Sequence, residues 1–227
     1  MQVLKNDGLD QDVLTDVGLE RLLLLLARCR RGALIWLAIP CSSWVWIGWA
    51  NSGRSGRWPT GNDSLQYTAL HNNIAEVSAH IESWATTLGL QFVIEQPLTS
   101  VLFDYWPVRR VFARHHEKRI SLSLQSFGAQ SQKMLELWGT TLWLHDLQQY
   151  AQWLRNYIPP AAETLCLKSV STVNGRPCIT GKKQKLKDSS AYPHAFGVAV
   201  AHRHKKHMQQ IHGGHADEPF FSLLDNL

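Results

Sequence analysis

Hydrophobic and polar positions divide the first hundred residues into alternating helix-like and strand-like segments. Apolar residues recur every three to four positions in 17–31 and again in 64–88, which is the periodicity of an amphipathic helix. The segments 33–39 (ALIWLAI) and 90–95 (LQFVIE) are continuous apolar runs, typical of strands covered on both faces of a parallel sheet. The order helix, strand, loop, helix, strand over 17–97 therefore predicts an α/β crossover.

Single residues predict where these elements begin and end. Gly32 and Gly89 are natural stops for the two helices, and Asp63 or Ser64 is expected to cap the start of the second one. The run 33–39 is expected to be a central strand, because nothing polar interrupts it.

The second half of the chain predicts a short helix, two paired strands, another helix, a hairpin and a last helix. Asn174-Gly175 is a strong hairpin signal. The expected ranges, in chain order, are a helix in 98–113, strands at 119–127 and 133–143, a helix at 146–157, the hairpin around 174–175 and a helix at 192–212.

These patterns together predict an α/β fold with a Rossmann-like, mostly parallel sheet, followed by a basic hairpin and a helix. The predicted organisation is an α/β domain at 1–160, the hairpin and helix at 161–212, and a frayed tail at 213–227. Residues 48–63 (GWANSGRSGRWPTGND) are expected to form a long mobile loop, and loops of this length usually serve function or are disordered.

Composition narrows the classes of protein. A hydrophobic content of 44% supports a core, and the net charge of +5 permits a polyanionic partner without requiring one. No C-x-x-C pair occurs, so we expect no zinc site, and the histidines at the carboxyl end are taken as part of a polar helix. The longest apolar run is too short to span a membrane and no signal peptide is evident, so an intracellular protein, nuclear or cytoplasmic, is expected.

The candidate chemistry lies where the two predicted parallel strands end. Cys41 follows the first strand, Glu95 closes the second, and ligands of open α/β sheets bind at the carboxyl ends of strands. A thiolate there is a candidate nucleophile, and a neighbouring carboxyl group can exchange a proton with a bound ring. The alternative is that Cys41 packs as a small apolar residue and Glu95 caps nearby backbone.

Two short motifs carry a resemblance to a known family. "IPCSSW" resembles the Pro-Cys motif of DNA cytosine-5 methyltransferases, and "VIEQP" resembles the Glu-Asn-Val or Glu-Asn-Pro motif that ends the next strand in that family. The resemblance implies that Cys41 adds to carbon 6 of a flipped-out cytosine and that Glu95 holds the ring at N3. It also implies S-adenosylmethionine as cofactor, with Pro40 and Asp12 (less so Asp16) beside it. Asp12 has an equal alternative as a capping residue before the first helix.

More closely, the chain is similar to methyltransferase-like proteins of algae, dinoflagellates and large viruses that are often associated with mobile elements. The matching pieces are "GALIWLAIPCSSWVWI", "FVIEQPLTSVL", "SQKMLELWGTTLW" and "AYPHAFGVAVA". The family pattern is incomplete. No Phe-x-Gly-x-Gly loop precedes Cys41, Gln96 stands where the family has Asn, and Arg119 matches the Gln-x-Arg-x-Arg motif poorly. We therefore expect a fragment that enters the fold partway, or a reduced relative.

Nucleic acid is the expected partner, DNA rather than RNA. Base flipping needs a loop and aromatic surfaces beside the nucleophile, and the segment after Cys41 offers both. The candidate nucleic-acid contacts are Ser42, Ser43, Arg54, Arg57, Trp58, Lys182, Lys183 and Lys185. The alternative for the charged residues is an ordinary solvated loop. "FGAQSQK" is taken as a structural turn, although it could bring Lys133 near the site.

The sequence thus predicts a cytosine-5 methyltransferase-like domain that acts on or binds nucleic acid. A catalytically inactive nucleic-acid-binding remnant of a mobile element is the alternative. A cysteine-dependent hydrolase or transferase ranks last, because no histidine is evident at a third strand end.

Overall fold

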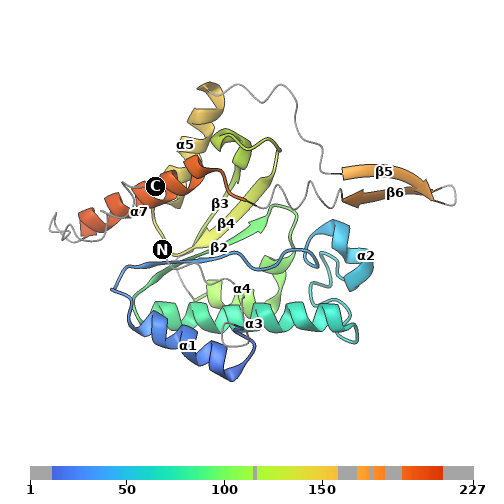
Figure 1. The fold of residues 1–227 in the computed structure, drawn as a ribbon, viewed down its shortest axis with the longest axis horizontal. Helices are drawn as coiled ribbons and strands as arrows, with labels where there is room; N and C mark the ends of the chain where they lie inside the picture. Colours follow the sequence, from blue (N-terminus) through green and yellow to red (C-terminus); the bar gives the residue numbers. More distant parts are fainter. Residues whose placement is uncertain (1–11, 115–116, 158–167, 174–175, 182–190, 212–227) are drawn as a thin grey trace.

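The computed structural model describes residues 12–114, 117–157, 168–173, 176–181 and 191–211 (Figure 1). The helices are α1 (Asp16–Ala27), α2 (Trp49–Ser52), α3 (Gln66–Thr87), α4 (Trp106–Phe112), α5 (Leu144–Tyr157) and α7 (His194–Ile211). Short 3-10 turns are η2 (Trp46–Gly48), η3 (Leu102–Asp104) and η4 (Leu124–Phe127). The strands are β1 (Leu34–Leu37), β2 (Gln91–Pro97), β3 (Lys118–Ser123), β4 (Met134–Gly139), β5 (Lys168–Val173) and β6 (Arg176–Gly181).

The main sheet has four strands in the order β1-β2-β4-β3, and this corrects the expectation of a mostly parallel sheet. β1 and β2 pair in parallel, joined by α3 as predicted, but β4 is antiparallel to both of its neighbours. The reason is the short connection through η4, which lets β3 turn directly back into β4 without a crossover helix. The described fold is therefore mixed α/β with one parallel pair.

β1 is an edge strand of the described sheet, which corrects its predicted central position. All four of its residues are only half-buried, whereas the five middle residues of β2 are buried. A continuous apolar run predicts a strand that is buried on both faces. This prediction is confirmed for β2, whereas β1 is less buried than its run predicts.

Helices cover both faces of the sheet, so its strands build two separate cores (Figure 1). Phe92 and Ile94 of β2 point to the face carrying α3 and α4, while Val93 between them points to the face carrying α5 and α7. By the same alternation, Glu95 lies on the α7 face and Gln96 on the α3 face. This separation decides which helix reaches each side chain.

All predicted helices are present, but three boundaries need correction. α1 ends at Ala27 and not at Gly32, α4 fills only Trp106–Phe112 of the expected 98–113, and the start of α3 also differs. Its N-cap is Leu65, which makes no side-chain capping bond. Asp63 instead accepts a hydrogen bond from the Asn72 side chain, and Ser64 bonds to Asn62. Gly89 ends α3 with φ of 71°, as expected for a helix stop.

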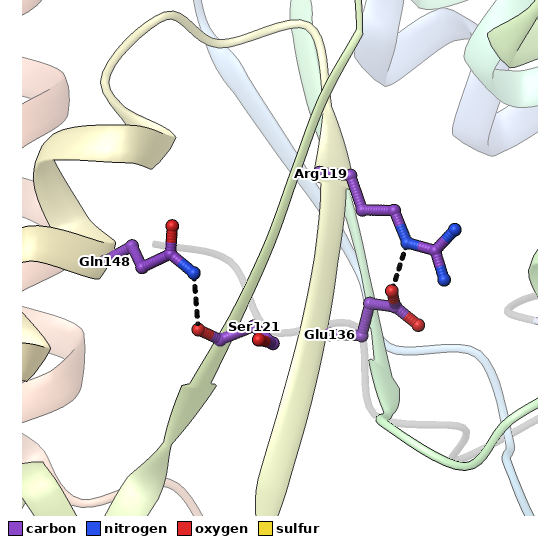
Figure 2. Close-up of polar contacts among 4 residues, drawn as sticks. All are labelled: Arg119, Ser121, Glu136 and Gln148. Carbon is purple, nitrogen blue, oxygen red and sulfur yellow. Dashed lines mark hydrogen bonds and ion pairs between the residues drawn. The ribbon is translucent and has the colours of Figure 1, made fainter.

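The free edge of β3 is covered by α5. Gln148 of α5 donates from Nε2 to the Ser121 carbonyl over 2.9 Å (Figure 2). On the other face of the sheet, Arg119 pairs with Glu136 of β4 and stacks on the Trp138 ring at 4.6 Å. Arg119 therefore binds residues of the neighbouring strand β4. The cover that α5 gives to the edge of β3 hinders pairing of that edge with another chain.

The predicted hairpin is present as the antiparallel pair β5–β6, which pairs Val173 with Arg176 at its tip. The Asn174-Gly175 turn itself lies outside the described residues. The pair extends from the body on the side of α2, with β6 close to η2 in the segment that follows Cys41 (Figure 1). In the described part of the chain, no helix combines the length and apolarity needed to cross a membrane.

Candidate functional site

The parallel pair brings Cys41 and Glu95 to the same end of the sheet. Leu37 of β1 pairs with Ile94 of β2, so the chain after β1 runs past the end of β2. Gln96, fully buried, donates from Nε2 to the Ile39 carbonyl over 2.7 Å. This bond fixes the backbone two residues before Cys41 against the residue that follows Glu95.

Gln96 is itself held by a second bond. Its Oε1 accepts from Ser100 Oγ over 2.8 Å, so the side-chain amide is satisfied at both ends. The Gln that departs from the family pattern therefore has a clear structural role, which is to clamp the two strand ends together.

Glu95 is 6% exposed and points to the α7 face of the sheet. Its Oε2 accepts a hydrogen bond from the Tyr192 hydroxyl over 2.7 Å. Its Oε1 is buried and has no hydrogen-bond partner among the described residues. A buried carboxylate oxygen without a partner is costly, which makes this atom a candidate contact for a hydrogen-bonding ligand.

Cys41 is half-buried, and its thiol lies in the electrostatic field of Glu95 and Lys133. Burial raises the pKa of the thiol above its ordinary value of 9.0, the Lys133 ammonium group lowers it, and Glu95 raises it again. The net shift is upward, so at neutral pH the sulfur carries its proton. Any nucleophilic role requires removal of that proton when a ligand binds.

Two members of this group lie far from Cys41 in the sequence. No periodicity or motif chemistry in the sequence singles out Tyr192 within "AYPHAFGVAVA". The sequence predicts a structural turn at Lys133, whereas in the fold the charge of Lys133 acts on Cys41. Only the placement of α7 and of the loop before β4 brings both residues to the ends of β1 and β2.

The segment after Cys41 is built on a buried arginine rather than open to solvent. Arg54 is 3% exposed, and its guanidinium stacks on the buried Trp44 ring at 3.4 Å. Burial lowers its pKa to about 10, so it stays charged at neutral pH. Its hydrogen-bond acceptors are Ser43 Oγ, the Pro59, Thr60 and Thr68 carbonyls, and Asn72 Oδ1.

This network corrects two predictions, the role of Arg54 as a nucleic-acid contact and the open loop after Cys41. Arg54 points inward and has no surface to offer a phosphate, although the sequence placed it among the nucleic-acid contacts. The expected long loop at 48–63 begins at the end of η2, contains α2, and packs against α3 through Ser52 and Arg54, both buried.

Ser43 and His71 form a buried pair, with Ser43 Oγ 2.9 Å from His71 Nδ1. Burial and the nearby Arg54 charge lower the pKa of His71, so its ring is neutral at pH 7. The pair resembles a nucleophile and its base, but Ser43 is completely buried and already bonded to Arg54. It therefore serves to hold the chain behind Cys41 and is not open to a substrate.

Other predicted contacts do lie at the surface. Ser42 is exposed and its hydroxyl accepts from the Tyr67 hydroxyl over 2.7 Å. Arg57 is exposed, and Trp58 is 62% exposed, with its indole N–H donating to the Gly61 carbonyl. The predicted exposure of Trp58 is confirmed, while its stacking role stays a prediction.

The two predicted cofactor residues, Asp12 and Pro40, lie in different surroundings. Asp12 Oδ1 accepts from the Leu14 amide over 3.0 Å, which makes it part of the turn before α1. Pro40 is exposed beside Cys41. Lys182, Lys183 and Lys185 lie outside the described residues. Within the described ranges, no group of three or more His, Cys, Asp and Glu side chains is arranged to hold a metal ion.

Comparison with known proteins adds no family to this description. No protein-family model, no curated protein and no solved structure matches the chain. The case for a function therefore rests on the site itself.

Proposed function

We propose that the chain binds a pyrimidine base of a nucleic acid, DNA in preference to RNA, and adds Cys41 covalently to it as a cytosine-5 methyltransferase-like domain. The observation that carries the proposal is the buried Oε1 of Glu95, which has no partner among the described residues and lies in the same site as the Cys41 thiol. A Rossmann-like fold is part of the same proposal.

The proposed step is an addition to carbon 6 of cytosine. The thiol proton passes through solvent to the Glu95 carboxylate, the sulfur–carbon 6 bond forms, and the carbon 5–carbon 6 double bond breaks. The displaced electron pair is delocalised through carbon 4 towards N3, which takes that proton from Glu95. Carbon 5 then has enamine character and accepts an electrophile or a solvent proton. Its original hydrogen leaves to solvent as a proton, and expulsion of the Cys41 thiolate from carbon 6 restores the base.

The methyl donor is a separate part of the proposal. S-adenosylmethionine would supply a methyl group to carbon 5 of the adduct. The described residues do not fit that cofactor well, because the Asp12 carboxylate is already bonded to the Leu14 amide and no Gly-rich loop follows a described strand. We therefore assign the chain's own residues to base binding and addition alone.

Exchange at carbon 5 tests the addition without a methyl donor. Reversible addition should release tritium to water from single-stranded DNA that carries 5-tritiated cytosine. The wild-type chain should release it, and Cys41→Ala and Glu95→Gln should not. A Cys41→Ala chain that releases tritium at the wild-type rate would refute Cys41 as the nucleophile.

A binding function without chemistry is the second candidate, favoured by the raised pKa of the Cys41 thiol and by the exposed Arg57 and Trp58. A remnant of this kind should bind DNA with an affinity that falls as salt rises and that Cys41→Ser leaves unchanged. Filter-binding titrations at several salt concentrations measure both. Affinity that is absent or independent of salt removes this candidate.

A further inference from the structure

We infer that Tyr192 is a positioning residue of the candidate site, which holds one oxygen of Glu95 and leaves the other for the ligand. The inference rests on the proposed function and deepens it, because it adds to the site a residue that lies just before α7. Its basis is the 2.7 Å bond from the Tyr192 hydroxyl to Glu95 Oε2, beside the unpartnered Oε1.

The start of α7 is fixed by aromatic packing. Phe196, 2% exposed, lies edge-on to Trp36 of β1 with ring centroids 5.9 Å apart. It also contacts Phe127 with centroids 5.2 Å apart. Pro193 accepts the first amide bonds of the helix with its carbonyl. These contacts place Tyr192, one residue before Pro193, over the ends of β1 and β2.

The direction of the hydrogen bond is settled by charge. Burial, followed by the charge of Glu95, raises the pKa of Tyr192 above its ordinary value, so the phenol keeps its proton at neutral pH. The phenol therefore donates and Oε2 accepts. When Glu95 carries a proton, that proton must lie on Oε1, since Oε2 already faces the Tyr192 hydrogen.

This arrangement has a consequence for the reaction. A ligand nitrogen can exchange a proton with Glu95 through Oε1 without any rotation of the carboxyl group. Loss of the Tyr192 hydroxyl leaves two buried oxygens unpartnered and frees the carboxyl to turn. Binding of DNA across the exposed surface should change little, whereas the rate of addition should fall.

Tyr192→Phe tests this with the tritium-release assay, because phenylalanine keeps the ring packing on Trp36 and Phe196. The rate at saturating DNA should fall by roughly 10-fold or more, and the half-saturating DNA concentration should stay within about twofold. Tyr157→Phe, an exposed tyrosine on α5, is the matched control and should behave as wild type. A Tyr192→Phe rate equal to wild type would overturn the inference.

A second measurement separates this inference from the proposed function. In protein labelled at the tyrosine ring carbon that bears oxygen, the Tyr192 resonance is the one missing from Tyr192→Phe. Glu95→Gln should shift that resonance at neutral pH, since it replaces the charged acceptor of the Tyr192 hydroxyl. An unchanged resonance overturns the inference whatever the enzyme does. A wild-type chain that releases no tritium overturns the proposed function, and the resonance then decides alone whether Tyr192 holds Glu95.

Discussion

Replacement of Arg54 by methionine should destabilise the whole chain, because this cation joins the segment after Cys41 to α3. Arg54 donates to five acceptors. Three of them keep another partner when it is removed. Ser43 Oγ retains His71, the Thr60 carbonyl retains the Asn72 amide, and the Thr68 carbonyl lies within α3.

Two acceptors are then left without a partner, the Pro59 carbonyl and Asn72 Oδ1. Asn72 is buried, and a buried acceptor left unsatisfied costs about 1–3 kcal/mol. The half-buried Pro59 carbonyl costs less, and the lost stacking on Trp44 costs about 1 kcal/mol. Relief from burying a charge offsets part of this sum. We expect the free energy of unfolding to fall by about 3 kcal/mol, which for a chain of this size lowers Tm by roughly 6–12 °C.

Urea unfolding followed by circular dichroism measures the change, with Arg57→Met as the matched control. Arg57 is an exposed arginine in the same loop, so its replacement should alter the free energy of unfolding by about 0.5 kcal/mol or less. If Arg54 instead met phosphates, as the sequence suggested, Arg54→Met would weaken DNA binding and leave stability intact. An Arg54→Met chain as stable as Arg57→Met would refute the buried network.

Three further results are expected. In a chain whose other cysteines are replaced by serine, alkylation of Cys41 by iodoacetamide should be slow at pH 7. The pH at which the alkylation rate is half-maximal should rise in Lys133→Gln and fall in Glu95→Gln. A half-maximal rate below pH 8 without the changes at Lys133 and Glu95 would contradict the burial of the thiol. Burial raises the pKa of Glu82 well above its ordinary value, so the folded chain binds the extra proton. Glu82 therefore lowers the free energy of unfolding as pH rises, by about 1.4 kcal/mol per pH unit between the ordinary and the raised pKa. In urea melts at several pH values, Glu82→Gln should remove this contribution to the slope. Gln96→Leu should lower the free energy of unfolding by about 1–3 kcal/mol, because it leaves the Ile39 carbonyl unbonded and takes away the acceptor of the Ser100 hydroxyl, which keeps its bond from the Leu102 amide. A neutral effect would remove the role of Gln96 as a clamp.

Local pattern was enough to predict most elements and the parallel pair. The helical periodicity of α3 and the apolar run of β2 are strong signals, and the spacing between Cys41 and Glu95 follows from one crossover. The sheet direction was not predictable in the same way, since the position of β4 between β2 and β3 depends on long-range pairing.

The site was predictable only in part for a related reason. Cys41 follows β1 and Glu95 lies near the end of the adjacent β2, which the sequence can predict. Tyr192 lies 97 residues after Glu95 in the chain, just before α7, and no local pattern links the two. Arg54 shows the opposite difficulty. A Gly- and Ser-rich loop predicts solvent exposure for its arginines, and only the tertiary fold shows that Arg54 is buried while Arg57 is exposed.

The most direct test of the central claim is to trap and map the covalent bond. An oligonucleotide with 5-fluorocytosine cannot lose its substituent from carbon 5, so an adduct that has taken up a solvent proton at carbon 5 cannot complete the exchange and is trapped by denaturation in acid. After digestion, mass spectrometry should find the nucleotide on the peptide that contains Cys41, without any added methyl donor, and should find none in Cys41→Ala or Glu95→Gln. Attachment to another residue, or an equal yield from Cys41→Ala, would contradict the account.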